Sequence, residues 1–445
     1  MNKSLTDKTW LVNIYSVFFE NHGFWLLCLT VFLLSFPTAM PLWSMSLFLF
    51  SGLIYWIKDF NRLISQFRKD AFIISLPLLY VVLNLIWAII QRPPLHSYSD
   101  SILFLVVPIF GYPVFKSSYF GKNFHTVLRY FIAGLVVVCV FDFARAFINS
   151  ITITDNGISF NPLIDPRISK ASIDILSSQS RFRSLELSLF ENPTYLSLKA
   201  LFALYLIVAF SKEMRISKIK VILLTVLFAV FIFSLSARAS FLSAAALIIY
   251  KSYTYFSQRR LIWLWVIFFP VIIFGFFKIS MMNTRIRQKT EVLIANIKSN
   301  INELKKSDSR ILAWTTSLEL IREKPFLGYG LHSRDKLAEE YRKNGFEYEA
   351  SVHLNPHNQF LETQLAFGLP GTMLLILMLF SPLLLLKDKD YRRMYIPFFI
   401  LFLCFLLFAS LLNGVWGAVF FILFYCMILL QGTKAELESS LNGQF

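Results

Sequence analysis

A series of long, unbroken apolar runs constrains this chain more than any other feature of its sequence. About 20 predominantly apolar residues cross the ~30 Å hydrocarbon core of a bilayer as a helix, and lipid admits only helices or closed barrels. The runs are continuous rather than alternating, and 56% of the 445 residues are hydrophobic. The sequence therefore predicts an all-α, polytopic membrane helix bundle.

Twelve membrane spans are predicted from these runs. Their approximate ranges are 24–39, 41–57, 72–91, 101–115, 126–148, 193–210, 219–236, 239–255, 261–278, 367–386, 394–412 and 413–431.

The distribution of Lys and Arg predicts the orientation of the chain, because short cytoplasmic loops are enriched in both. Basic residues gather near the N-terminus, at 58–69, 116–129, 212–220, 251–260 and 387–393, and at Lys434, whereas the short loops on the other side hold only Arg92 and Arg238. Both termini are therefore expected in the cytoplasm. Residues 1–278 would form nine spans, 279–358 a helical loop on the outer face, and 359–445 the last three spans; a second outer segment covers about 149–192.

Charge and cysteine content exclude several kinds of partner. The net charge of +16 is explained by cytoplasmic anchors facing anionic lipid head groups, and gives no reason to expect nucleic acid. Cys28, Cys139, Cys404 and Cys426 lie within apolar runs, where packing is their expected role. The only Asp-x-Asp sequence falls in a basic cytoplasmic turn at 388–390, and there is no nucleotide-binding fingerprint. No metal or cofactor is predicted.

The large outer loop is predicted to be helical. An amphipathic helix is expected at about 283–306, a second from Asp308 or Ser309 to Glu323, and a third at about 334–343. Pro325 would end the second helix, and residues 328–330 would form a turn. We expect this loop to lie as a lid over a cavity at membrane level.

A short stretch after this loop offers a candidate base. Asn355 as cap and Pro356 at the first helical position would place His357 in the first turn of a helix. The helix dipole there disfavours the imidazolium form, so a neutral ring is expected; a plain interfacial anchor is the alternative. Gly368 and Pro370-Gly371 would break this helix before the next span. His332 and His353 are weaker alternatives for the base, and the role of Glu362 stays undecided.

Cationic residues at membrane depth point to an anionic ligand, because ionisable groups there are costly and mark functional sites. Arg238 lies in a turn of small residues, Arg310 opens a loop helix, and Arg181, Arg183 and Lys199 flank the start of the sixth span. Guanidinium groups bind phosphate through paired hydrogen bonds, so a diphosphate at the bilayer surface would fit. Snorkelling or a helix cap remains open for Arg238, and an intrahelical pair with Asp142 for Arg145.

The pattern His357-Asn358, nine residues, then Gly368-Leu-Pro-Gly371 resembles the motif of the O-antigen ligase and Wzy-type polymerase superfamily. The similarity covers about 190–431 and includes an Arg in a small-residue turn and an Arg-x-x-x-Trp helix at Arg310. It implies a GT-C-like fold, with His357 activating an acceptor hydroxyl and with Arg238 and Arg310 holding a donor diphosphate. The substrate-binding positions expected beside them are Arg181, Arg183, Asn358, Lys199, Gly368 and Gly371.

The resemblance implies a metal-independent, inverting glycosyltransferase in the bacterial inner membrane, with its active site facing the periplasm. Its donor would be an undecaprenyl-diphosphate-linked glycan, and its acceptor a hydroxyl of lipid A-core. Three alternatives stay open. They are a Wzy-type polymerase, a protein O-oligosaccharyltransferase and, from a different class, a transporter or flippase of lipid-linked sugars.

Overall fold

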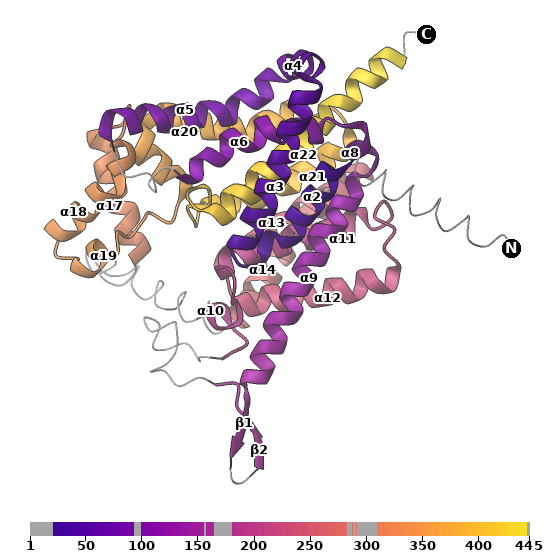
Figure 1. Cartoon of the computed structure of the whole chain (residues 1–445). Helices are drawn as coiled ribbons and strands as arrows, with labels where there is room; N and C mark the ends of the chain where they lie inside the picture. Colours follow the sequence, from indigo (N-terminus) through magenta and orange to yellow (C-terminus); the bar gives the residue numbers. More distant parts are fainter. Residues whose placement is uncertain are drawn as a thin grey trace.

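The computed structural model describes residues 21–92, 99–154, 157–163, 180–282 and 309–442, together with Arg287 and Glu291. Its regular structure is almost entirely helical (Figure 1). The elements before the large loop are α2 (His22–Phe32), η1 (Leu33–Ser35), α3 (Ala39–Lys58), α4 (Phe60–Lys69), α5 (Ala71–Gln91), η3 (Ser99–Ile102), α6 (Leu103–Phe110), α7 (Tyr112–Phe115), α8 (Ser118–Lys122), α9 (Phe124–Asn149), β1 (Ile151–Thr154), β2 (Gly157–Phe160), α10 (Ser184–Leu187), α11 (Pro193–Phe210), α12 (Lys218–Leu235), α13 (Arg238–Gln258) and α14 (Ile262–Met282). Those after it are α17 (Ser309–Glu323), η4 (Gly330–His332), α18 (Ser333–Lys343), α19 (Glu347–Ser351), α20 (Gln359–Leu385), α21 (Lys389–Leu406), η5 (Leu411–Asn413) and α22 (Val415–Asn442).

Eight helices in the described part of the chain are long and apolar enough to cross a membrane, namely α3, α5, α9, α11, α12, α14, α20 and α22. The polytopic all-α class is therefore confirmed. Every predicted span overlaps a helix, but the first is short, at 22–35, and the fourth is divided between α6 and α7. α13 and α21 have 21 and 18 residues but are not among the eight apolar helices. The number twelve is not established.

Phenylalanine rings form the centre of the bundle. In the most apolar part of α22, 89% of the residues are buried, against none in α14. Around α22, six rings from α9, α11, α21 and α22 contact one another at centroid distances of 4.6–6.2 Å; they are Phe131, Phe202, Phe398, Phe402, Phe420 and Phe424. Edge-to-face and offset contacts of this kind add to the stabilisation from burial alone. The Phe-rich composition thus supplies the packing between helices.

Side-chain caps begin several helices where the sequence changes from polar to apolar. The Asn192 side chain accepts a hydrogen bond from the Thr194 amide, and Pro193 occupies the first helical position of α11. Asp388 caps α21 in the same way through the amides of Asp390 and Tyr391. Such caps satisfy amides that have no partner within the helix. They fix where the helices at each end of the bundle begin.

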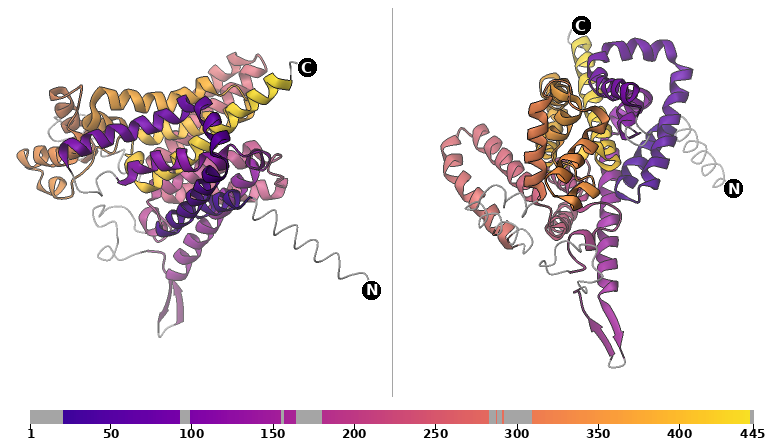
Figure 2. Two further views of the ribbon diagram at one scale, coloured as in Figure 1. Left: turned by 45° about the horizontal axis from the view of Figure 1, so that its top comes forward. Right: turned by 90° about the vertical axis from the view of Figure 1, so that its left-hand side faces the viewer.

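A two-stranded antiparallel hairpin, β1 with β2, follows α9 and pairs Ile151 with Phe160. The hairpin projects away from the bundle in both views of Figure 2. In a different part of the molecule, α14 packs against α13, and these two helices (salmon) lie at its edge. The hairpin falls in the first segment predicted to lie outside the membrane.

The described part of the large loop is a compact helical unit with its own small core. Leu312 and Leu320 of α17, Leu337 and Tyr341 of α18, and Leu365 of α20 are buried together. The predicted second and third loop helices are confirmed as α17 and α18. Apart from Arg287 and Glu291, the predicted amphipathic helix at 283–306 lies outside the described residues. The unit packs at one end of α5 and α20 (Figure 1).

Candidate active site

The candidate site gathers at the end of the bundle where α11, α13, α20 and α22 begin. Gln359, the first residue of α20, donates to Asn413 at 3.0 Å and accepts from the Leu412 amide at 2.8 Å. Lys199 Nζ lies 5.0 Å from the ring centre of Trp416, near the start of α22. Segments more than 200 residues apart in the sequence, 193–199 and 411–416, are thereby brought together.

His357 stands immediately before α20 rather than inside its first turn. Asn358 is the cap of α20, accepting from the amides of Phe360 and Leu361, whereas Asn355 accepts from the His357 amide at 2.9 Å. His357 itself has a left-handed backbone, with φ 49°. The predicted cap at Asn355 is therefore wrong. Two asparagines three residues apart both suited that role, and the second, Asn358, is the one that caps the helix. The predicted place of His357 in the first turn of the helix is corrected with it.

The His357 ring is partly buried and makes no hydrogen bond or ion pair within the described part of the chain. Burial lowers its pKa below the usual value, the Arg310 charge lowers it further, and Glu362 opposes both. A buried imidazole beside a guanidinium favours the neutral form. The neutral ring expected from the sequence thus has a different physical cause, since the ring lies outside the helix whose dipole was invoked.

Arg310 reaches the neighbourhood of His357 because α17 is attached to the turn before α20. Trp314, one turn along α17 from Arg310, donates its indole N–H to the Pro356 carbonyl at 2.8 Å. The Trp314 ring also packs against Phe408, just beyond α21. Two residues that are 47 positions apart in the sequence are therefore brought close enough for their charges to interact.

Arg238 is the first residue of α13, after a sharp turn in which Ser236 has φ 55°. Two residues further on, Ser240 donates to Ser197 of α11 at 2.7 Å. Arg238 therefore lies near the start of α11, and its side chain is partly buried. It is not among the charges that shift the pKa of His357.

The other predicted cations fall into two groups. Lys199 is 1% exposed, pairs with Glu191 at 2.8 Å and donates to the Leu34 carbonyl. It is an interior ion pair, and burial raises the pKa of Glu191 to about 7 against the opposing effect of Lys199. Arg181 and Arg183 are partly buried in the segment that leads into α10.

This segment is held by α9 through two polar side chains. Arg145 donates to the carbonyls of Glu186 and Leu187, and Asp142 accepts from the Leu189 amide at 3.3 Å. Both side chains therefore bind backbone groups of the segment at 186–189. An intrahelical pair is not needed to explain Arg145, and the two residues fix the path of the chain between Arg183 and α11.

The glycine positions of the motif are sites of close backbone approach. Gly368 interrupts α20 with φ 60° and ψ −154°, and a Cβ there would lie 2.1 Å from the Phe326 carbonyl oxygen. Gly328 has φ 68°, and a Cβ added there would lie 2.6 Å from the Ala366 carbonyl oxygen. The predicted break at Gly368 is therefore present. It lets the loop backbone dock against α20.

Gly371 lies one turn beyond this break. A Cβ there would lie 2.4 Å from the Cβ of Phe367. Both Gly368 and Gly371 are buried. Atoms of the chain thus surround both glycines, which favours a packing role over direct contact with a substrate. Gly368 packs against the loop, and Gly371 packs against Phe367 and Thr363 of α20 itself.

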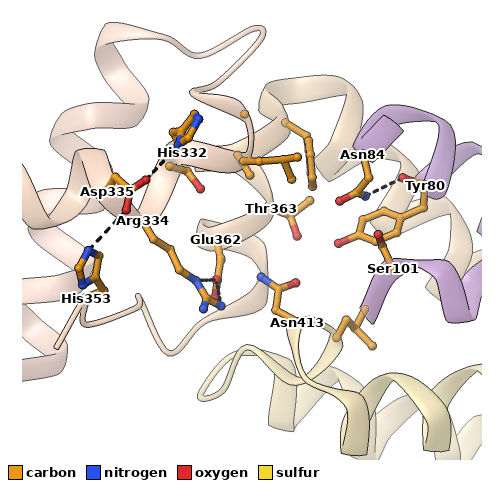
Figure 3. Close-up of a pocket in the computed structure, with 16 residues that line it drawn as sticks. Tyr80, Asn84, Ser101, His332, Arg334, Asp335, His353, Glu362, Thr363 and Asn413 are labelled. Atoms are coloured by element: carbon orange, nitrogen blue, oxygen red, sulfur yellow. Dashed lines mark hydrogen bonds and ion pairs between the residues drawn. The ribbon is translucent and has the colours of Figure 1, made fainter. Parts of the chain in front are cut away.

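A cavity of about 430 Å³ lies between the loop unit and the ends of α5 and α20. At its centre Arg334 of α18 donates to Glu362 Oε1 through Nε at 2.8 Å and Nη2 at 2.6 Å (Figure 3). Thr363 and Asn413 lie between this pair and Asn84 of α5 (Figure 3). Sequence reasoning had named Glu362 without a role and had missed Arg334. In the sequence, only its place in a charged loop helix distinguished Arg334, and a separation of 28 positions from Glu362 gives no local signal that the two side chains pair.

His332 and His353 lie at the edge of the same cavity, on either side of Asp335, at 3.0 and 3.4 Å from its carboxylate oxygens. All three side chains are about half exposed. Within the described ranges, no group of three or more His, Cys, Asp or Glu residues is arranged to hold a metal ion.

Fold and site together define a polytopic helical membrane protein with a histidine and several arginines gathered at one end of the bundle. Residues 223–376, from α12 into α20, match the family model described as O-antigen ligase. This match supports membership in the O-antigen ligase superfamily, which the motif had suggested, and the matched region contains Arg238, Arg310 and His357. Membership indicates an enzyme of the ligase or polymerase type that handles lipid-linked glycans. No curated protein matches the chain.

Proposed function

We propose that this protein is a glycosyltransferase that moves a glycan from undecaprenyl diphosphate to a hydroxyl of lipid A-core at the periplasmic face of the inner membrane. The observation that carries the proposal is the attachment of α17 to the turn that holds His357, through the Trp314–Pro356 hydrogen bond at 2.8 Å. This attachment brings the Arg310 charge near a partly buried ring, and burial and that charge both lower the pKa of His357. A hydroxyl nucleophile needs a base, and a departing diphosphate needs positive charge.

The reaction would proceed by direct displacement. The His357 ring takes the proton of the acceptor hydroxyl while the acceptor oxygen bonds to the anomeric carbon. The bond from that carbon to the diphosphate oxygen breaks, and the leaving undecaprenyl diphosphate keeps the electron pair. Arg310, and Arg238 from the start of α13, would stabilise the charge on the leaving group. Such a displacement inverts the anomeric centre.

The positions of the remaining predicted residues support secondary roles. Asn358, the residue directly after His357, caps α20 and so fixes where the helix begins. Gly368 lets the loop backbone dock against α20, and Gly371 allows close packing of Phe367 and Thr363 within α20. Arg181 and Arg183 remain candidates for binding the diphosphate. Lys199 is committed to Glu191, so we assign it a structural role.

The test is reconstitution of purified protein with an undecaprenyl-diphosphate-linked glycan and, separately, with lipid A-core or a second lipid-linked glycan as acceptor. Transfer to lipid A-core is expected, and growth of the lipid-linked chain alone would favour the polymerase. His357→Ala is expected to lower kcat by about 10²–10⁴-fold, with Arg238→Ala and Arg310→Ala also inactive. Normal transfer in all three variants would refute the assignment. Lipid translocation retained by His357→Ala without any transfer in the wild type would favour a flippase.

A further inference from the structure

The cavity between the loop unit and α20 is built differently from the neighbourhood of His357 and Arg310. Its lining includes neither Arg310 nor Arg238. Among the described residues, Arg334, Glu362 and Asp335 are the Arg, Lys, Asp and Glu side chains that line it, one guanidinium against two carboxylates. This balance of charge does not favour binding of a diphosphate. The diphosphate of the donor is therefore not expected to bind in this cavity.

The rest of the lining combines uncharged hydrogen-bonding groups with apolar surface. Asn84 and Ser101 lie across from Thr363 and Asn413, and Tyr80 and Phe367 add aromatic surface (Figure 3). Asn84, Ser101 and Thr363 are at most 8% exposed. Buried hydroxyl and amide groups beside aromatic rings complement a ligand with many hydroxyl groups and apolar C–H faces.

Glu362 supplies a second, independent observation. Its side chain is 3% exposed, and Arg334 occupies only Oε1. The other oxygen, Oε2, is buried and has no hydrogen-bond partner in the described part of the chain. Leaving a buried charged oxygen unsatisfied is costly, so a ligand with hydroxyl donors would be stabilised here.

The cavity also lies next to the proposed base. Glu362 and Arg334 are both close enough to His357 to shift its pKa, in opposite directions. Gln359 joins the start of α20 to Asn413 of the cavity wall. His357 does not itself line the cavity, but it precedes Gln359 by two residues. A sugar ring held in this cavity would therefore lie near the turn that carries the proposed base.

We infer that this cavity binds an uncharged sugar ring of the substrate, most directly that of the acceptor, with Glu362 Oε2 accepting hydrogen bonds from its hydroxyl groups. This inference rests on the proposed function. It makes Glu362 a substrate-binding residue, and Arg334 a residue that positions the Glu362 carboxylate.

The experiment compares Glu362→Gln with Glu347→Gln, the same chemical change at an exposed carboxylate of α19. Purified variants are assayed with an undecaprenyl-diphosphate-linked glycan as donor and rough lipopolysaccharide as acceptor. The assay runs at about pH 8, above the ordinary histidine pKa, so that the charge state of His357 does not differ between them. For Glu362→Gln we expect KM for one substrate to rise about tenfold to a hundredfold with kcat little changed.

The two substrates act as separate arms. A raised KM for rough lipopolysaccharide supports the acceptor as the occupant, and a raised KM for the donor alone supports a sugar of the donor glycan instead. Unchanged KM values for both, or a fall in kcat alone, would overturn the inference while wild-type transfer still upheld the proposed function.

A direct binding measurement tests whether a change in KM comes from weaker binding of the sugar rather than from a change in another step of the reaction. Saturation-transfer NMR with lipid-free core oligosaccharide, in the absence of donor, should give a signal with the wild type and Glu347→Gln that is lost in Glu362→Gln. An equal signal in all three proteins would also overturn the inference. Because it needs no turnover, this measurement remains informative if the proposed reaction is wrong.

Discussion

Replacing Gly368 with Ala should detach the loop from α20. With φ 60° and ψ −154°, this position lies in a region used almost only by glycine, where another residue costs about 1–3 kcal/mol. The added Cβ would also lie 2.1 Å from the Phe326 oxygen and 2.3 Å from its carbonyl carbon. Both atoms belong to the backbone, so relieving the clash should cost roughly a further 1–3 kcal/mol.

Gly345→Ala is the matched control, since Gly345 also has a positive φ, 79°, but no atom lies within 4 Å of the added Cβ. Both variants carry conformational strain, and only Gly368→Ala carries the clash. Amide hydrogen exchange in detergent measures the result at Tyr329, whose amide donates to the Leu365 carbonyl at 2.8 Å, and at Leu369, which donates to Pro325 at 3.1 Å. We expect Gly368→Ala to lower their protection about 5- to 150-fold more than the control does. Equal protection in the two variants would refute the clash.

Two further predictions concern charge. Removing the Arg310 cation in Arg310→Gln should raise the pKa of His357 toward the ordinary value, because a nearby positive charge disfavours the imidazolium form. The NMR titration of the His357 ring, which needs no transfer activity, should then move to higher pH, and an unmoved titration would show that the two residues do not interact. Lys199→Met leaves the Glu191 carboxylate buried without its partner, which costs about 3–5 kcal/mol when a buried pair is broken. Adding Glu191→Leu should recover much of this loss in thermal unfolding, and a double variant no more stable than Lys199→Met would argue against an interior ion pair.

Apolar runs and caps made much of this fold predictable from sequence. A continuous apolar run has few alternatives in lipid, so all twelve predicted spans overlap helices. The helix predicted to begin at Asp308 or Ser309 and to end before Pro325 is present as α17, with Ser309 its first described residue. The number of crossings was harder to predict. α13 and α21 carry polar residues along helices of spanning length, and α6 and α7 divide one predicted run, so length and hydropathy alone do not decide whether these segments cross.

The site was predictable only where local chemistry determines it. The motif located His357, but the backbone around it depends on a choice between two asparagine caps and on a left-handed φ that sequence does not reveal for a non-glycine residue. Glu362 was visible as a carboxylate, yet its partner Arg334 comes from another helix. Lys199 looked like a free cation at the membrane edge, because nothing in the sequence shows that Glu191 is buried against it.

The attachment of the loop unit bears on how a substrate reaches the site. Its backbone is bonded to α20 through Tyr329 and Leu369, and the side chain of Gln91, at the end of α5, donates to the Tyr329 carbonyl and accepts from the Leu331 amide. Lifting the unit would break all of these bonds together and leave their groups without partners, at about 1–3 kcal/mol for each buried group. The loop unit is therefore expected to stay in place while substrate binds, rather than to open and close over the site. A substrate anchored by its own hydrocarbon tail would then enter laterally from the bilayer. The loop unit would limit only how far the head group of that substrate can move into the site.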